Sequence, residues 1–331
     1  MPAPVPPDAP VILGYSDAAI AEAARLIAEG GIVAVPTETV YGLAADATND
    51  AAVARIYAAK GRPSFNPLIV HVLNQAAAEA LAEFDDDARA LAAAFWPGPL
   101  TLVLPLRAHA GIAELVTAGL STIAIRAPDH RAMRALLVAT GKPLAAPSAN
   151  RSNGISPTRA EHVAASLGAA VPLILDDGPT RAGLESTIVQ GRIILRPGPI
   201  TADQIATTLF SREGGNPAPQ IGLGSRLRGS TGGDTTAPTA PGQLLSHYAP
   251  TKPLRLDATD AATDEWLIGF GPVAGDDNLS PTGDPVEAAA RLFDTLHRAD
   301  ASARPRIAIA PIPPAGIGEA INDRLRRAAH H

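Results

Sequence analysis

The sequence predicts an α/β protein in which a twisted, mixed open sheet with flanking helices is followed by a smaller α/β domain. Three observations support this fold class. Short apolar runs typical of buried strands alternate with helical segments at irregular spacing up to about residue 209. A stretch rich in Gly, Pro, Ser and Thr follows, and a second alternation of strands and helices begins after it. The 331 residues are enough for two domains.

The first helix is expected over residues 16–29. Ser16 or Asp17 can cap its start, apolar side chains recur on one face, and Gly30 can end it. The apolar residues 32–35 then predict a short buried strand.

A second helix is expected over residues 50–60, ending at Gly61, and a strand at 68–72 follows the intervening loop. Thr158 and Glu161 match a capping box at the start of a later helix. Other strands are expected at 100–106, 122–125, 144–146, 171–175, 186–189 and 193–195, and other helices near 85–95, 129–140 and 158–167.

The composition divides the chain into three parts. Residues 11–210 form the first α/β domain, residues 211–250 a linker rich in Gly and Pro, and residues 251–331 a small second α/β domain. In the second domain, strands are expected at 253–256, 266–270 and 307–310, and helices near 285–298 and 317–328.

Residue types and charge exclude several classes of protein. Hydrophobic residues make up 46% of the chain, yet no apolar run approaches the roughly 18 residues of a membrane helix. The first ten residues lack the features of a secretory signal, so a cytoplasmic location is expected. The chain has no cysteine, which excludes disulfides, thiolate nucleophiles and Cys-ligated metals. No HExxH-type pair occurs, so no protein-ligated transition metal is expected.

The charge pattern argues against broad binding of nucleic acid. The net charge is −6, and residues 1–210 hold 15 Lys and Arg against 19 Asp and Glu, a net −4. An RNA-binding domain of this kind would normally be basic. A local basic groove stays compatible with these numbers.

Two loops carry the clearest chemical signal. Residues 60–68 and 147–158 combine cations, small hydroxyls and amides with Pro, Gly and Asn, which fix the backbone. Such loops can direct several donors at a polyanion. The standard phosphate motifs, GxxxxGK[ST] and GxGxxG between a strand and a helix, are absent. The loops therefore indicate a nucleotide site on another scaffold.

Each of these residues also has a simpler interpretation. Lys60 and Arg62 suit a solvated helix C-terminus, where cations are favoured. The serines of the second loop suit ordinary turns. His71 in an apolar strand suits a satisfied core histidine. Arg126, at the end of a buried strand, needs an anionic partner or an escape to water.

Taken together, the motifs resemble the YrdC-type threonylcarbamoyl-AMP synthases, in order and spacing over residues 16–209. The segment 243–250 and the small domain after it resemble the long form of that family. The matching segments are Pro36–Leu43, Lys60–Pro63, Asn66–Leu68, Pro97–Thr101, Ile125–Pro128, Pro147–Asn150, Glu185–Thr187 and Leu195–Gly198.

The resemblance implies a YrdC-like catalytic domain, a linker that reaches over the site and a Rossmann-like C-terminal domain. It implies catalytic roles for Lys60 and Arg62 and closure of the site by Tyr248. The implied L-threonine pocket consists of Thr39, His71, Arg126, Ala146 and Ser186. The implied ATP contacts are Arg62, Asn66, Thr122, Ser148, Ser156, Arg196 and Tyr248.

The activity implied is the joining of L-threonine, bicarbonate or CO₂, and ATP into threonylcarbamoyl-AMP, with release of pyrophosphate. Mg²⁺ would come with the nucleotide, and the product would pass to the tRNA threonylcarbamoyl-adenosine machinery. Direct contact with tRNA stays open, and no membrane partner is expected. The alternatives are a related carbamoyl-adenylate transferase and a non-catalytic double-stranded-RNA-binding factor. Asn153 departs from the family pattern, in which Gly is usual, but Asn also tolerates a positive φ.

Overall fold

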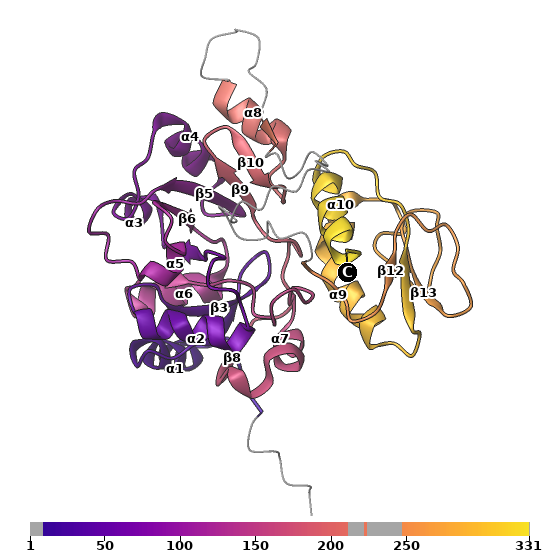
Figure 1. Cartoon of the computed structure of the whole chain (residues 1–331), viewed down its shortest axis with the longest axis horizontal. Helices are drawn as coiled ribbons and strands as arrows, with labels where there is room; N and C mark the ends of the chain where they lie inside the picture. Colours follow the sequence, from indigo (N-terminus) through magenta and orange to yellow (C-terminus); the bar gives the residue numbers. More distant parts are fainter. Residues whose placement is uncertain (1–8, 211–221, 224–246, 331) are drawn as a thin grey trace, which may run out of the picture.

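The computed structural model describes residues 9–210, 222–223 and 247–330 and contains two α/β units side by side (Figure 1). The larger unit is built on an 11-stranded sheet and the smaller on a 4-stranded sheet. The expected class, a mixed open sheet followed by a smaller α/β domain, is therefore confirmed. Most of the expected linker, residues 211–250, lies outside the described residues.

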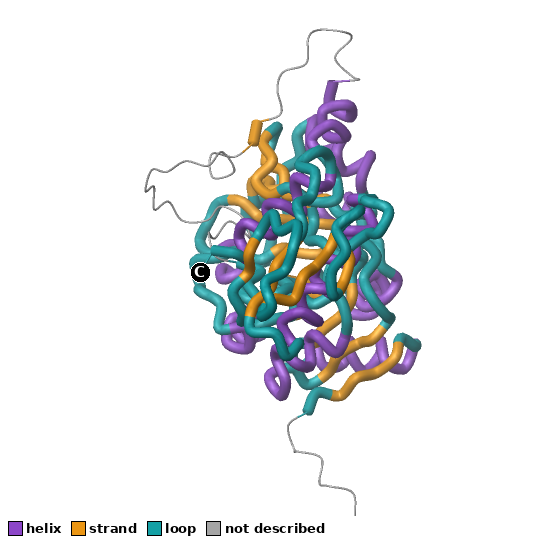
Figure 2. Tube along the Cα trace, turned by 90° about the vertical axis from the view of Figure 1, so that its right-hand side faces the viewer, coloured by secondary structure: helices purple, strands orange, loops and turns teal. Residues whose placement is uncertain are grey.

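The large sheet is mixed, with five parallel and five antiparallel neighbour pairs in the order β1-β8-β2-β3-β7-β4-β6-β5-β9-β10-β11. The sheet extends from β8 near the bottom of Figure 1 to β10 near the top. Figure 2 views the molecule from the side with the same vertical direction. The strands of the large sheet are β1 (Val11–Gly14), β2 (Val33–Pro36), β3 (Tyr41–Asp46), β4 (Ile69–His71), β5 (Leu100–Pro105), β6 (Thr122–Arg126), β7 (Leu144–Ala145), β8 (Leu173–Asp176), β9 (Thr187–Gln190), β10 (Ile193–Arg196) and β11 (Gly222–Leu223).

Helices cover both faces of this sheet. The helices α1 (Asp17–Ala28) and α6 (Arg131–Thr140) pack on one face through Ile20, Ile27, Met133 and Leu136. The other face is covered by α2 (Asp50–Lys60), α3 (Gln75–Glu79), α4 (Asp86–Phe95), α5 (Glu114–Thr117), α7 (Ala160–Leu167), followed by the short η1 (Gly168–Ala170), and α8 (Ala202–Phe210). Among the described residues, no helix has the length and apolar character needed to cross a membrane.

Local chemistry explains the ends of the helices nearest the site. The Ser16 side chain accepts from the amide of Ala19 and starts α1, as expected. Asn49 does the same for α2, and Gly61 ends α2 in the left-handed region at φ 58°. The loop that follows, which carries Arg62, therefore leaves the helix in a direction fixed by a glycine.

One sequence expectation about local structure needs correction. The capping box at Thr158 and Glu161 does not form, because α7 begins one residue later than expected, with Arg159 at its N-cap and no side-chain capping bond. The Thr158 amide and hydroxyl lie instead against Nδ1 of His162. The strand β3 was not anticipated, because the sequence there is punctuated by hydroxyls and Gly42. It forms because it pairs with β2 and β7.

The small unit has four parallel strands in the order β12-β15-β13-β14. These are β12 (Leu254–Arg255), β13 (Glu265–Gly269), β14 (Asp277–Asn278) and β15 (Arg306–Ile309). Two helices, α9 (Pro285–Ala301) and α10 (Ile317–Ala328), pack against the sheet and form its main core. The all-parallel order agrees with the Rossmann-like expectation.

In Figure 1 these two helices lie between the small sheet and the large unit. The contact is intimate, since a Cβ placed on Gly183 would come within 2.4 Å of the Ala290 carbonyl oxygen on α9. Arg159 pairs with Asp294 of α9 at 2.7 Å, and Leu184 belongs to the same apolar cluster as Phe293. The small unit is therefore docked on the segment that leads into β9.

Candidate active site

A pocket lies where the ends of several strands of the large sheet meet residues that follow the linker. Eleven of its residues come from turns or strand ends of the large unit that are far apart in the sequence, and two come from the segment that enters the small unit. These residues are Thr37, Thr39, Arg62, His71, Arg126, Ala146, Pro147, Ser148, Glu185, Ser186 and Arg196, with His247 and Tyr248. Val40, Gly42 and Ile69 complete the lining.

The turn between β2 and β3 supplies buried hydroxyls. Thr37 Oγ1 lies 2.8 Å from Thr39 Oγ1 and donates to the Val40 carbonyl at 2.7 Å. Glu38 between them is 3% exposed. These bonds hold the turn so that Thr39 faces the neighbouring strand end of β6.

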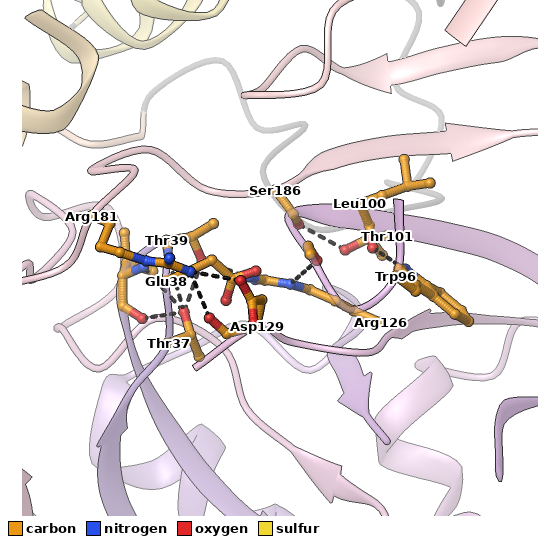
Figure 3. A network of polar contacts seen from close by, with 12 residues as sticks. Thr37, Glu38, Thr39, Trp96, Leu100, Thr101, Arg126, Asp129, Arg181 and Ser186 are labelled. Atoms are coloured by element: carbon orange, nitrogen blue, oxygen red, sulfur yellow. Dashed lines mark hydrogen bonds and ion pairs between the residues drawn. The ribbon is translucent and has the colours of Figure 1, made fainter. Parts of the chain in front are cut away.

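Arg126 ends β6 and reaches this turn, as Figure 3 shows. Its guanidinium donates to Thr39 Oγ1 at 2.9 Å and to the Gly98 carbonyl at 3.2 Å, and it lies 2.6 Å from a carboxylate oxygen of Glu38. Arg126 is 3% exposed. The expected anionic partner of this arginine is therefore Glu38, and its fixed fork is held at the pocket wall.

His71 lies beside Arg126, because β4 and β6 are parallel and the two residues are in register. Burial, with the Arg126 charge as a second cause, lowers the pKa of His71 to about 3. The imidazole is therefore neutral near pH 7. Its Nδ1 is buried and has no hydrogen-bond partner among the described residues, so it can bind a polar group of a ligand.

Ser186 also lines the pocket, just before β9. Its hydroxyl lies 2.7 Å from Thr101 Oγ1, and Arg196 donates to both its carbonyl, at 3.0 Å, and its hydroxyl, at 3.2 Å. Burial lowers the pKa of Arg196, as expected for a desolvated guanidinium.

Arg62 follows Gly61 and folds back over its own loop. It donates to the carbonyls of Asn66, at 3.1 Å, and Pro67, at 2.8 Å. Burial lowers the pKa of Arg62 to about 10, so it keeps its charge at neutral pH. Neither Arg62 nor Arg196 forms an ion pair with a carboxylate within the described part of the chain, which leaves two cations available to an anionic ligand.

Lys60 lies elsewhere than the sequence predicts. It is 3% exposed, so the interpretation as a solvated charge is wrong. Its ammonium donates to the carbonyls of Ser148, at 2.6 Å, and Asn150, and it does not line the pocket. Lys60 thus ties the loop after β7 to the end of α2.

The same loop meets the segment after the linker. Asn153 adopts φ 69°, so the turn that the sequence left uncertain is kept with Asn in place of Gly. The Asn153 carbonyl accepts from the amide of Ala249 at 2.8 Å, and Gly154 pairs with Ala249 as a parallel bridge.

Tyr248 lines the pocket from that segment. It is fully buried and adopts φ 65°, and its hydroxyl lies close to the Arg196 guanidinium without a hydrogen bond of ordinary geometry among the described residues. The remaining cavity measures about 50 Å³, far below the roughly 300–1,000 Å³ of typical small-molecule sites. Admission of a nucleotide therefore requires the Tyr248 segment to move.

The structure gathers most of the site residues that the sequence singled out. All five expected threonine contacts line the pocket, together with four expected ATP contacts, namely Arg62, Ser148, Arg196 and Tyr248. Thr122 does not, since it begins β6 while Arg126 ends it. Asn66 is buried behind Arg62, and Ser156 donates its hydroxyl to Glu185.

Three polar lining residues, Thr37, Glu185 and His247, are absent from the contacts expected from the sequence. Thr37 and Glu185 stand next to or within matched motifs, and His247 directly precedes Tyr248, so proximity along the chain was the available signal. Glu185 accepts from Ser156 and from Arg324 of α10, which no local pattern indicates.

The arrangement has a clear chemical division. One side offers Arg126, neutral His71 and the Thr39 hydroxyl, which suit a small zwitterion, and the Ser186 hydroxyl, to which Arg196 donates, lies between this side and the other cations. The other side offers the guanidinium groups of Arg62 and Arg196, which suit phosphates. Among the described residues, no group of three or more His, Cys, Asp or Glu side chains is placed to hold a metal ion.

Comparison with known families agrees with this division into two units. The Sua5/YciO/YrdC family model, described as "Telomere recombination", matches residues 25–198. A second model, described as "Threonylcarbamoyl-AMP synthase, C-terminal domain", matches residues 200–330.

Individual relatives match over nearly the whole chain. The threonylcarbamoyl-AMP synthase of Bacillus subtilis is 39% identical, covering 96% of this chain and 94% of the relative. That of Pyrococcus abyssi is 36% identical, covering 93% of each. The crystal structure of P. abyssi Sua5 complexed with L-threonine is similar with a TM-score of 0.85 and 34% identity, covering 96% of this chain and 97% of that one.

Proposed function

This chain belongs to the threonylcarbamoyl-AMP synthase family, and from that premise we propose that it converts L-threonine, bicarbonate or CO₂, and ATP into threonylcarbamoyl-AMP and pyrophosphate. The product would serve the threonylcarbamoyl-adenosine modification of tRNA. In this proposal the enzyme is a nucleotidyltransferase, because it transfers the adenylyl group of ATP to a carboxylated amino acid.

One observation carries the proposal: a single pocket joins a buried arginine, a neutral histidine and two hydroxyls to a pair of cations that have no carboxylate partner among the described residues. Arg126 offers the remaining donors of its guanidinium to an α-carboxylate, while Thr39 and Ser186 offer hydroxyls. Arg62 and Arg196 line the same cavity. A threonine and a nucleotide bound there would meet at their reactive ends.

The threonine end would bind and orient the amine. Buried Arg126 fixes the carboxylate, and neutral His71 presents Nδ1, which has no partner in the described structure, to a polar group of the amino acid. Once the amine has reacted with CO₂ to give a carbamate, an oxygen of that carbamate attacks the α-phosphorus. The bond from the α-phosphorus to the bridging oxygen breaks, and pyrophosphate leaves with the electron pair.

The nucleotide end would stabilise that leaving charge. Arg62 and Arg196 are desolvated and fixed by carbonyl oxygens, so little reorganisation is needed when negative charge develops. Mg²⁺ would enter on the nucleotide and neutralise the phosphates there. Lys60 would act by holding the Ser148 loop, since its ammonium already binds two carbonyls of that loop.

Tyr248 would serve as a lid over the reaction. Its buried ring covers the cavity, and a labile carbamate and adenylate need protection from water. Tyr248→Ala should lower the amount of threonylcarbamoyl-AMP recovered per pyrophosphate released, whereas Tyr248→Phe should retain the wild-type ratio because it keeps the ring that covers the cavity. An unchanged ratio in Tyr248→Ala would remove the lid role.

The decisive experiment measures pyrophosphate release from ATP with threonine, with serine and without amino acid, each with and without bicarbonate. The proposed function requires release that depends on both threonine and bicarbonate, with threonylcarbamoyl-AMP identified by mass. A carbamoyl-adenylate transferase with another acceptor would not show the threonine dependence. A non-catalytic RNA-binding factor would show neither, but would bind RNA in a salt-sensitive way. The product would be passed to its tRNA-modifying partners in the cytoplasm.

A further inference from the structure

Arg324 is a fully buried arginine of α10 that contacts the active site across the boundary between the two units. Its exposed fraction is 0%, and its Nε donates to Glu185 Oε2 at 2.9 Å. Glu185 lines the pocket and directly precedes Ser186. A side chain of the small unit thus holds a wall of the pocket in the large unit.

Glu185 is held from both sides. Its other carboxylate oxygen accepts from the hydroxyl of Ser156, which lies in the large unit. Arg324 is itself fixed by Asp323, which accepts from its Nη1 at 2.8 Å, and Asp323 also accepts from Arg327 at 3.0 Å. The carboxylate of Glu185 therefore has one position only while α10 is docked.

The same guanidinium supports Tyr248. Its central carbon lies 5.1 Å from the centre of the Tyr248 ring, a cation–π contact. The ring also stacks on Phe293 of α9, with centres 5.6 Å apart, and the amide of His247 donates to the Arg327 carbonyl at 3.4 Å. Arg324 thus contacts two pocket residues that come from different segments.

The contacts of Arg324 are not explained by the stability that a buried ion pair provides. A buried arginine costs several kcal/mol to desolvate, and apolar residues often replace such pairs without loss of stability. Here Arg324 also keeps Nη2 buried without a hydrogen-bond partner in the described structure. An unsatisfied buried donor costs free energy, so stability alone does not account for an arginine at this position.

We propose that Arg324 is a positioning residue of the synthase reaction, through which the small unit fixes Glu185 and holds the Tyr248 ring over the pocket. This inference rests on the proposed function. The pocket reaches its closed geometry only while α10 is docked, so the C-terminal domain takes part in substrate binding although the large unit supplies the other pocket walls.

The test compares Arg324→Gln and Arg324→Lys with Arg326→Gln, a matched control because Arg326 is exposed on the same helix. We measure KM for ATP and threonine, kcat, Tm, and the Kd for ATP by calorimetry. Arg324→Gln should raise KM and Kd for ATP about 10-fold or more, which corresponds to about 1.4 kcal/mol, because Glu185 and the Tyr248 ring are then no longer held in place around the bound nucleotide. Arg324→Lys should recover part of this, because an ammonium pairs with Glu185 but lacks the planar fork.

A lower Tm with KM and Kd within about twofold of the wild type would overturn the proposal and leave Arg324 a structural residue. The same holds if Arg326→Gln has the same effect as Arg324→Gln. Should Arg324→Gln fail to fold, Arg324→Met keeps the packing volume and is judged by the same constants. If the wild type releases no pyrophosphate, the proposed function fails, and the Kd values for ATP still decide the role of Arg324.

Discussion

Buried cations in and around the pocket are held mainly by oxygen atoms of the backbone. Arg62, Arg196 and Lys60 all donate to carbonyls, whereas Arg126 pairs with the carboxylate of Glu38. Carbonyl oxygens orient a cation without neutralising it, so its charge stays available to a ligand. This choice of partner distinguishes Arg62 and Arg196 from the arginine of an ordinary buried salt bridge.

Arg62 offers the most direct test of a single residue. Arg62→Ala should lower kcat/KM on the order of 10²-fold or more, since it removes a preorganised donor for the phosphates. Arg107→Ala is the matched control, because the exposed Arg107 also donates to two carbonyls, those of Glu79 and Ala82, but away from the pocket. Turnover close to wild type in Arg62→Ala would exclude the role.

A substitution of Lys60 distinguishes a catalytic role of this residue from a positioning role. Lys60→Met leaves two carbonyls of the Ser148 loop without their donor, so the free energy of unfolding should fall by about 2–3 kcal/mol. KM for ATP should rise with it, because the loop relaxes. Denaturant unfolding and steady-state kinetics check this, with exposed Lys142→Met as control. If turnover instead slows on the order of 10²-fold while stability is unchanged, the catalytic role first expected of Lys60 is restored.

Among the elements of the fold, the loop before β9 is the part that joins the two units. Gly183 lies in it at φ 67°, against the backbone of α9, and Glu185 and Ser186 follow within three residues. A side chain at Gly183 has no room. The position of α9 therefore sets the position of two pocket residues.

Gly183→Ala should lower the free energy of unfolding by about 2–3 kcal/mol, which combines backbone strain with overpacking against α9. Gly178→Ala is the control, because Gly178 has φ 78° but no atom within 4 Å of an added Cβ. Its cost should be only that of the left-handed backbone, about 1–2 kcal/mol. Equal losses for the two variants, measured by denaturant unfolding, would mean that α9 does not restrain this loop.

Across the whole molecule, the two units share apolar and polar contacts. Val40, Ile155 and Leu184 of the large unit belong to the same core cluster as Tyr248 and the helices of the small unit. Deleting the chain from about residue 243 would therefore expose core surface as well as remove the lid. Point variants are the cleaner probes of closure.

A stacked histidine pair lies at this boundary. His162 of α7 and His297 of α9 have ring centres 3.8 Å apart, with Asp294, Arg159 and Arg298 beside them. Burial, followed by the neighbouring His297, lowers the pKa of His162 to about 3, and burial also lowers the pKa of His297.

Because the pKa values of His162 and His297 are lower in the folded protein than in the unfolded chain, the stability of the fold depends on pH. Between the unfolded pKa of about 6.5 and the folded value, the unfolded chain binds more protons, so stability falls as pH falls through that window. Each such histidine contributes up to about 1.4 kcal/mol per pH unit. Unfolding free energies at about pH 5.0–6.5 should show a shallower slope for His162→Gln than for wild type. Identical slopes would show that His162 does not titrate in this way.

Much of the architecture could be predicted from the amino-acid sequence without coordinates: the class of fold, most strands and helices, and the pocket residues that stand in motifs. Local signals are sufficient there, because Ser16 caps the helix that follows it and Gly61 ends the helix that precedes it. Short apolar runs predict buried strands whichever strands they pair with. Local signals fail for β3, whose sequence departs from a strand pattern and which forms by pairing with β2 and with the distant β7. They also do not say which end of a strand lines the pocket, and Thr122 lies at the other end of β6 from Arg126.

The roles of the buried charges became clear only from the packed fold. The contacts of Lys60 with the Ser148 loop and of Arg324 with Glu185 join residues 88 and 139 positions apart, so no pattern along the chain encodes them. Burial makes each cation take whichever oxygen the packed fold brings near, because an unpaired charge in the interior is too costly. The motifs therefore predicted which residue types line the pocket. How the pocket is enclosed depends on how the two units pack.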